Sequence, residues 1–379
     1  MVNRSSTKSG TQLILLFSRN GKLTTWKNSG YLTREETYYQ HLLKTFPTIK
    51  WITYGGPEDT EISRDIENIT VVTNKTNLSA DRHIKNVSSI INDSKSTINI
   101  LKTNQLSSAY DAYKIYRTTK IPYVIRCGNV RNYWILQKNI KSKIGNWIKL
   151  KIALHSSLKL IVPTQQEAQY AQKLFILPKS KIAIVPNFVP TDLFKPNNKY
   201  TTHKNLLGFV GNFKYSKNLP SLIKAISSLP DIKLRLIGDG PQKEQLKNLA
   251  ESNRVNLEII PKQPHENLPP LLNECEAFVF PSFFEGHPKA LLEAMACELP
   301  VITTPVYGIN NLIEHKQNGF LCPDTSPKAI RSTILQVLQN KNLSNKIAKA
   351  GREFVINNYS MQNVINKEIS IYKELNILS

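Results

Sequence analysis

The sequence predicts an α/β protein built from two doubly wound domains that face each other across a cleft. Three observations support this prediction. The chain has 379 residues, which is too many for one ordinary hydrophobic core. Short β-rich stretches alternate with helical patterns in both halves, as in parallel sheets with crossover helices. A polar stretch with two prolines and no hydrophobic period, "VPTDLFKPNNKYTTHKN" (189–205), separates the two series.

The first series occupies the N-terminal half and predicts a domain over residues 1–190. Its strands are short apolar runs bounded by polar or turn residues. Helical patterns such as "TREETYYQHLLKTF" (33–46) and "SSAYDAYKIYRTT" (107–119) lie between several of them. The predicted strands are "QLILLF" (12–17), "IKWITYGG" (49–56), "ITVVT" (69–73), "INILKTN" (98–104), "IPYVIRCG" (121–128), "LKLIVPT" (158–164) and "KIAIVPNF" (181–188).

The second series predicts a C-terminal domain over residues 206–358, joined to the first by a hinge at 191–205. Helices are expected near 218–228 and 241–252, and a final helix at 359–379 is expected to pack back toward the N-terminal domain. The predicted strands are "LLGFVGN" (206–212), "IKLRLIGDG" (232–240), "VNLEIIP" (255–261), "AFVFPS" (277–282) and "PVITT" (300–304).

Charge points to an anionic partner. Lys and Arg number 50 against 28 Asp and Glu, a net charge of +22, which suits nucleic acid, an acidic membrane surface or phosphorylated small molecules. The densest basic run, "KNIKSKIGNWIKLK" (138–151), predicts a basic amphipathic helix that could lie on anionic lipid. A solvated helix packed against the core explains the same pattern equally well.

Cysteine usage and hydropathy favour a cytoplasmic protein. The four cysteines have no metal-ligand or C-x-x-C spacing, so we expect free thiols in a reducing compartment. No apolar run approaches the roughly 20 residues that span a bilayer. The expected location is therefore the cytoplasm, with the inner face of the membrane as a peripheral binding surface.

The stretch "PSFFEGHPKALLEAMACELPVITTP" (281–305) contains two carboxylates, Glu285 and Glu293, with seven residues between them. A predicted strand precedes it, and a helix is expected to start near Pro288, which suits a first helical turn. Glu285 then lies in the loop before the helix, where unpaired N–H groups form an anion site. Gly286 permits close approach of a ligand to the backbone.

Glu293 falls within the apolar part of this helix. An ionised carboxylate there is costly unless it has partners, and a vicinal diol is a good bidentate partner. A solvated helix face is the alternative explanation for this residue alone.

These motifs together resemble the GT-B glycosyltransferases of family four, the retaining group 1 glycosyl transferases with an E-x7-E motif. The resemblance covers roughly residues 180–325 and is weaker in the N-terminal half, where only the alternating layout matches. It is carried by "KIAIVPNFVPTDLFKP" (181–196), "FVGNFKYSKN" (209–218), "LIGDGP" (236–241), "ECEAFVFPS" (274–282) and "FEGHPKALLEAMACELPVITTPVYGINNLIEHKQNGFLC" (284–322).

The resemblance implies two Rossmann-like domains and a role for each matching residue. Glu285 would hold donor-sugar hydroxyls, Glu293 the ribose hydroxyls, and Lys217 the leaving diphosphate. Gly211 would let the backbone approach that phosphate. The remaining donor-binding positions implied are Gly286, His287, Pro288 and Lys289.

This chain departs from the family pattern at two places. Asn212 stands where the family usually has arginine, so one of two expected cations on the diphosphate is missing unless Lys214 replaces it. The N-terminal stretch "YVIRCGNVRNYW" (123–134) lacks the histidine that such families often carry. Arg126 or Arg131 there would face the phosphates, or both are surface arginines. Gly30 and Arg34, in "NSGYLTREE" (28–36), would close over the donor.

The implied activity is transfer of a hexosyl-type sugar from a UDP- or GDP-sugar to a glycan or lipid-linked acceptor, as in polysaccharide and cell-envelope biosynthesis. No D-x-D occurs, so neither a metal nor another cofactor is expected. One alternative is a catalytically weak sugar-nucleotide binder, suggested by Asn212. A nucleic-acid binder is suggested only by the charge, and no nucleic-acid module is present.

Overall fold

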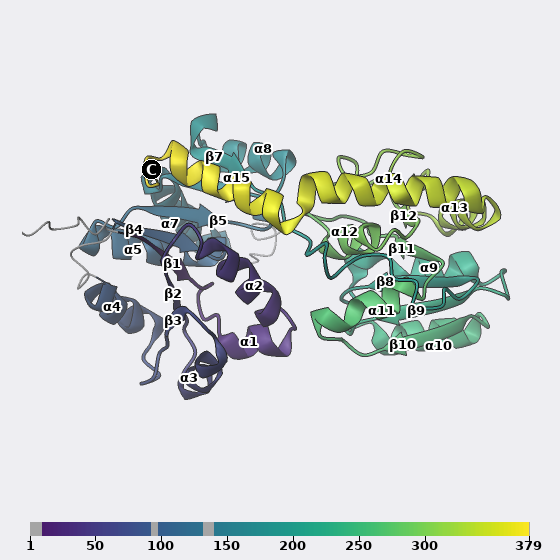
Figure 1. Cartoon of the computed structure of the whole chain (residues 1–379), viewed down its shortest axis with the longest axis horizontal. Coiled ribbons are helices and arrows are strands. Elements are labelled where there is room, and N and C mark those ends of the chain that lie inside the picture. Colours follow the sequence, from purple (N-terminus) through teal and green to yellow (C-terminus); the bar gives the residue numbers. More distant parts are fainter. Residues whose placement is uncertain (1–9, 92–97, 132–139, 379) are drawn as a thin grey trace, which may run out of the picture. The chain divides into compact units, whose positions relative to one another are not determined.

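The computed structural model describes residues 10–91, 98–131 and 140–378, and the chain divides into two compact units. Unit 1 comprises Met1–Val185 together with Ile365–Ser379, and unit 2 comprises Pro186–Val364. Each unit contains one parallel sheet flanked by helices (Figure 1). The two doubly wound domains predicted from the alternating pattern are therefore confirmed.

Unit 1 has a seven-stranded sheet in the order β3-β2-β1-β4-β5-β6-β7. All seven predicted strands are present, and every pairing is parallel. The central register pairs Leu13 with Ile49 on one side and with Ile100 on the other. The strands are β1 (Thr11–Leu16), β2 (Thr48–Ile52), β3 (Ile69–Val72), β4 (Ile98–Thr103), β5 (Tyr123–Arg126), β6 (Lys159–Val162) and β7 (Ile182–Ile184).

The described helices of unit 1 connect these strands, and α4, α5 and α7 pack in series. Local sequence sets their ends. Thr164 caps α8 because its Oγ1 accepts the Glu167 N–H at 3.1 Å. The helices are α1 (Leu23–Asn28), α2 (Leu32–Leu42), α3 (Pro57–Ile62), α4 (Ala80–Ile91), α5 (Ala109–Thr119), α7 (Ile140–Ser156) and α8 (Gln165–Phe175).

Unit 2 has a six-stranded parallel sheet in the order β10-β9-β8-β11-β12-β13. Five of its strands were predicted, whereas β13 was not, because two residues leave no periodic signal. The strands are β8 (Leu206–Val210), β9 (Lys233–Ile237), β10 (Asn256–Ile260), β11 (Ala277–Phe280), β12 (Val301–Thr303) and β13 (Phe320–Leu321). The helices are α9 (Leu219–Ile226), α10 (Lys243–Ser252), α11 (Leu268–Asn273), α12 (Lys289–Ala296), α13 (Pro327–Gln339) and α14 (Lys341–Tyr359).

The last helix, α15 (Met361–Glu374), begins in unit 2 and continues in unit 1. Within unit 1 its Glu368 is fully buried and forms an ion pair with Lys102 of β4. Tyr38 of α2 donates a hydrogen bond to the same carboxylate at 2.6 Å. These contacts attach the C-terminal helix to the unit 1 sheet.

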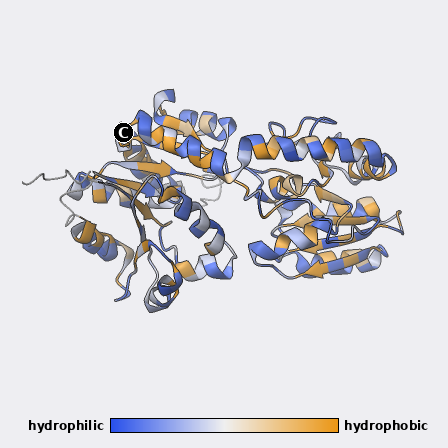
Figure 2. Ribbon diagram, viewed as in Figure 1, coloured by the Kyte–Doolittle hydropathy of each residue, from blue (hydrophilic) through white to orange (hydrophobic). Residues whose placement is uncertain are grey.

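The strands are the most apolar part of both units, and Figure 2 shows them coloured mainly as hydrophobic. This is the pattern of parallel sheets, whose strands are covered on both faces.

The four cysteines are buried free thiols, as predicted, and burial raises the pKa of Cys127 to about 12. Within residues 10–91, 98–131 and 140–378, no helix is long and apolar enough to cross a membrane.

Candidate active site

Two loops of unit 2 meet beyond the carboxyl ends of neighbouring strands. One follows β8 and contains Gly211 to Lys217, and the other follows β11 and contains Glu285. Because β8 and β11 are adjacent and parallel, both loops leave the sheet at the same edge. The N–H of Phe283 donates a hydrogen bond to the Ser216 carbonyl at 2.8 Å, which joins the loops directly.

The joined loops place Lys217 against Glu285. The Nζ of Lys217 lies 2.6 Å from Oε1 of Glu285, and the side chains are 18% and 12% exposed. Ser282 Oγ donates a second hydrogen bond to the same carboxylate oxygen at 2.7 Å. The Lys217 ammonium also lies 4.8 Å from the centre of the Phe280 ring. The Lys217 ammonium and the Glu285 carboxylate are thus held together at the carboxyl ends of β8 and β11.

The backbone around this pair depends on glycine at position 308. Gly308 has φ +83°, and a Cβ added there would lie 2.2 Å from the Glu285 carbonyl oxygen. The Glu285 N–H donates to the neighbouring Tyr307 carbonyl at 2.9 Å. Any side chain at position 308 would therefore push the Glu285 loop away.

The glycine of the β8 loop also has an unusual backbone. Gly211 has φ +154°, and a Cβ there would lie 3.1 Å from Cζ of Phe209. The next residue, Asn212, is exposed, as is Lys214, whose N–H donates to the Asn212 carbonyl at 2.9 Å. Both side chains therefore lie at the surface of the loop that carries Lys217.

Helix α12 begins near Pro288, where the sequence predicts its start. Pro288 is its N-cap, and Lys289 is the first helical residue. Gly286, His287 and Pro288 are buried, and Lys289 is half-buried. The His287 carbonyl accepts a hydrogen bond from Asn187 Nδ2 at 3.2 Å. The first turn of α12 thus follows Glu285 closely in the chain.

Glu293 is buried, with only 5% of its surface exposed, so the solvated-face alternative is wrong. Its Oε1 lies 2.9 Å from Nε2 of His265, which is 9% exposed. His265 begins the short 3₁₀ helix η5 (His265–Asn267), which follows β10. Sequence reasoning missed this histidine, although its position after a strand of the same sheet was a usable signal.

Aromatic residues beside the Lys217–Glu285 pair were also missed. Tyr215 is 75% exposed and Phe284 is 44% exposed, although both belong to otherwise well-packed loops. The Tyr215 ring lies 5.2 Å from the Phe283 ring. An exposed aromatic group therefore borders the polar pair.

The residues predicted on the acceptor side lie in unit 1. Gly30 has φ +68° between α1 and α2, and Arg34 is buried in α2. Arg126 ends β5 near Glu368. Burial lowers the pKa of Arg126, but the Glu368 carboxylate and other acidic groups outweigh this effect and raise it. Arg131 is exposed, and its N–H donates to Glu167 at 3.3 Å.

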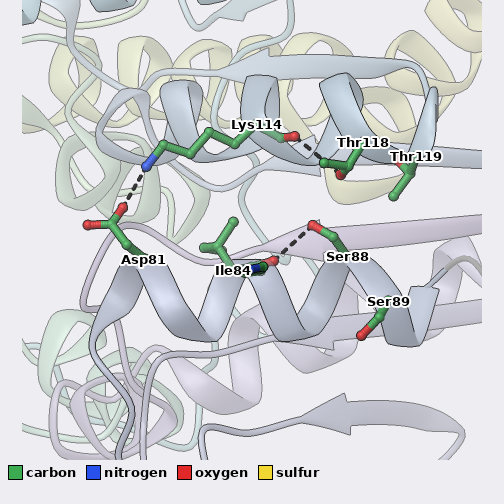
Figure 3. Close-up of a pocket in the computed structure, with 8 residues that line it drawn as sticks. Asp81, Ile84, Ser88, Ser89, Lys114, Thr118 and Thr119 are labelled. Carbon is green, nitrogen blue, oxygen red and sulfur yellow. Dashed lines mark hydrogen bonds and ion pairs between the residues drawn. The ribbon is translucent and has the colours of Figure 1, made fainter.

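A separate groove of about 470 Å³ lies between α4 and α5 (Figure 3). Lys114 crosses it to form an ion pair with Asp81 at 2.5 Å. None of the predicted site residues lines this groove, so it does not coincide with the sequence motifs. Its lining residues are Asp81, Ile84, Lys85, Ser88, Ser89, Lys114, Thr118 and Thr119.

The fold of the chain is similar to that of solved structures of other proteins, and this similarity defines the fold class. HepE of Anabaena, in a structure with UDP, matches with a TM-score of 0.77 at 14% identity. The match covers 96% of this chain and all of the HepE chain. The chain therefore has the GT-B fold, with two Rossmann-like domains.

Sequence comparison then gives the family. Residues 191–354 match the model of the family "Glycosyl transferases group 1". An uncharacterized glycosyltransferase of Methanocaldococcus jannaschii is 26% identical over 59% of this chain and 68% of its own length. The UDP-Gal:alpha-D-GlcNAc-diphosphoundecaprenol alpha-1,3-galactosyltransferase of Escherichia coli is 24% identical over 63% of this chain. That match covers 65% of the relative's own length, just under two thirds.

Residues 191–354 are therefore a domain of the group 1 glycosyl transferase family, whose named relatives are enzymes. The resemblance identified in residues 180–325 is thereby confirmed at the level of the family.

Proposed function

We propose that the protein is a retaining glycosyltransferase that moves a sugar from a nucleotide-diphosphate sugar to a glycan or lipid-linked acceptor. The observation that carries this proposal is the Lys217–Glu285 pair at the meeting point of the β8 and β11 loops. The UDP in the HepE structure and the lipid-linked sugar in the name of the E. coli relative support the donor and acceptor classes.

The chemistry requires positive charge where the diphosphate leaves. As the anomeric C–O bond breaks, the electron pair passes to the nucleotide diphosphate, and an acceptor hydroxyl bonds to the anomeric carbon. The hydroxyl proton departs with the nucleotide diphosphate. Lys217 and the first N–H groups of α12 would stabilise the charge on the leaving group. Before the donor binds, Glu285 holds Lys217; afterwards, its carboxylate would accept sugar hydroxyls instead.

The other donor contacts extend from this pair. Glu293 would accept the ribose hydroxyls, and Gly211 and Asn212 would lie along the diphosphate. The buried Gly286–Lys289 segment would present backbone groups to the sugar and phosphates. Arg34, Arg126 and Arg131, with the turn at Gly30, would serve the acceptor and phosphate side.

The proposed reaction is independent of metal ions, because Lys217 and a helix N-terminus supply the positive charge. In the part of the chain that the structure describes, no group of three or more His, Cys, Asp or Glu is arranged to hold a metal.

A catalytically weak sugar-nucleotide binder is a second candidate. The exposed Asn212 favours it, because relatives with arginine there would have one more cation on the diphosphate. The two candidates differ in product formation, since a pure binder releases no nucleotide from the donor.

A thermal-shift screen with UDP- and GDP-sugars tests the donor class. A donor that binds the native state should raise the unfolding temperature, and the same donor should slowly release nucleotide on incubation. Glu285→Gln should abolish the release while the fold persists. If no nucleotide sugar stabilises the wild-type protein, the proposed function is wrong.

An anionic membrane surface is the proposed second partner, with the enzyme peripheral on the cytoplasmic face. The helix α7 has four lysines and no carboxylate. On its buried side lie Leu150, Ala153 and Leu154. On its outward side, a solvated helix would carry polar residues. Instead it presents isoleucines at four-residue spacing: Ile144 (58% exposed), Ile148 (48%) and Ile152 (40%).

An apolar outward stripe flanked by lysines suits the headgroup region of anionic lipid better than bulk water. Sedimentation with phosphatidylglycerol vesicles should retain the protein, whereas phosphatidylcholine vesicles should not. Ile148→Gln should weaken the binding several-fold. The matched control is Ile90→Gln in α4, since Ile90 is 51% exposed. Equal effects of both substitutions would exclude α7 as the membrane-binding surface.

A further inference from the structure

The Glu293–His265 contact joins two elements that the sequence motif does not connect. Glu293 lies in α12 after β11, whereas His265 lies in η5 after β10. Their side chains meet at 2.9 Å, and both residues are at least nine-tenths buried. The pair is therefore shielded from water, unlike an ordinary surface contact.

The His265 ring is itself held in place. Its centre lies 4.8 Å from that of the buried Phe194 ring. The η5 turn is closed by a hydrogen bond from the Asn267 N–H to the Pro264 carbonyl at 3.0 Å. Packing on one side and a closed turn on the other leave the imidazole little rotational freedom. It can therefore serve as a rigid donor.

The carboxylate that His265 faces determines which of its ring nitrogens carries the hydrogen. Nε2 faces a carboxylate oxygen, which accepts hydrogen bonds, so Nε2 must be the donor. A buried carboxylate is costly without such donors, and a donor from a fixed direction also sets the plane of the carboxylate. The orientation of Glu293 therefore depends on His265 as well as on its own helix.

We infer that His265 is a positioning residue for nucleotide recognition, holding the Glu293 carboxylate in the orientation that accepts the ribose hydroxyls of the donor. This inference rests on the proposed function, because it assigns Glu293 to the ribose. His265 touches the carboxylate and acts on the nucleotide through it. Loss of His265 should therefore impair the recognition of ribose more than that of the base or the phosphates.

Titration calorimetry with UDP and GDP, and with their 2′-deoxy analogues, tests this inference. The wild-type protein should bind one ribonucleotide about tenfold more tightly than its 2′-deoxy form, as expected when a hydrogen bond to a charged group is lost. His265→Ala should remove most of that ratio. His265→Gln, which keeps an N–H donor, should retain part of it. His203→Ala, at an exposed histidine of the same unit, should leave the ratio unchanged.

A double-mutant cycle separates positioning from general stability. If His265 acts through Glu293, adding His265→Ala to Glu293→Ala should not weaken ribonucleotide binding further. A purely structural role would lower the unfolding temperature and weaken both nucleotide forms alike, with the ratio unchanged. His265→Gln gives the same comparison if His265→Ala does not fold.

An unchanged ribose ratio in the His265 variants, or additive losses in the cycle, would overturn the inference and leave the proposed function intact. Failure of the wild-type protein to bind either UDP or GDP would overturn the proposed function, and this inference with it.

Discussion

Lys217 and Glu285 form an ion pair of 2.6 Å although 68 positions separate them in the chain. Each follows a different strand, and the backbone hydrogen bond from Phe283 to Ser216 aligns the two loops. The pair is mostly shielded from solvent, where Coulomb interactions exceed their strength in water. A bound donor would therefore have to replace this ion pair, with its diphosphate contacting Lys217 and its sugar hydroxyls contacting Glu285.

Replacing Lys217 by alanine should lower turnover far more than replacing Lys214. We expect a loss on the order of 100-fold for Lys217→Ala, because it removes the cation aimed at the leaving group. Lys214 is exposed, so Lys214→Ala should cost less than about threefold. Nucleotide release at saturating donor measures both. Equal, small effects would indicate that the phosphates are held elsewhere, for example by Arg126.

Glu293→Ala should weaken donor binding while α12 remains helical, since alanine is the best helix former. The expected loss is about 1–3 kcal/mol, the range for hydrogen bonds to charged groups. Titration calorimetry with the donor gives this value directly. An unchanged affinity would remove Glu293 from the ribose site.

Asn212→Arg tests whether the diphosphate site is weakened or rearranged. We expect slower nucleotide release in a folded protein, because the new charge would meet an arginine that already serves the diphosphate. The Coulomb penalty is larger in a partly dry site than in water. Faster release would instead show that the site lacks a cation that arginine can restore.

Gly308→Ala should disable the Glu285 loop. The added Cβ would lie 2.2 Å from the Glu285 carbonyl oxygen at φ +83°, so the loop must move. Displacement of a catalytic group by about 1 Å can cost about 100-fold in rate. The matched control is Gly145→Ala in α7, where no atom lies within 4 Å of the new Cβ. Turnover of the two variants should differ by at least tenfold; similar turnover would contradict the steric argument.

Glu368→Gln should destabilise unit 1 by about 3–5 kcal/mol, because it leaves Lys102 buried without its counter-ion. Urea unfolding followed by tryptophan fluorescence is specific for this unit. All four tryptophans lie within Met1–Val185: Trp26, Trp51, Trp134 and Trp147. A loss below about 1 kcal/mol would mean that the pair behaves like a surface contact.

The same carboxylate predicts a pH dependence. Burial raises the pKa of Glu368, but Lys102 and Arg126 outweigh burial, and the folded pKa lies below the ordinary value of 4.5. Its contribution to stability is therefore complete above about pH 4.5 and is lost as the pH falls through the lower folded pKa. Glu368→Gln should lack this acid-dependent loss, which unfolding curves at several pH values will show.

The sequence by itself determined the strands of both sheets, apart from β13, and drew attention to the stretch that contains Glu285 and Glu293. Twelve of the thirteen strands were predictable because buried parallel strands are short apolar runs between turn residues, and the periodicity is local. Glu285 and Glu293 were singled out locally as candidate site residues, and Lys217 was added through the resemblance of the stretch that contains it. What the motifs could not show was how the loops that carry them meet.

Only the tertiary structure decided the partners of these residues. His265 lies 28 positions before Glu293, and Lys102 lies 266 positions before Glu368. Nothing in the spacing of the chain specifies such pairs, because they depend on which strand ends are neighbours in the sheet and how each buried carboxylate is satisfied. A buried charge must find a donor or cation among the groups that folding brings to it. That requirement is met by three-dimensional proximity, which local sequence patterns do not encode.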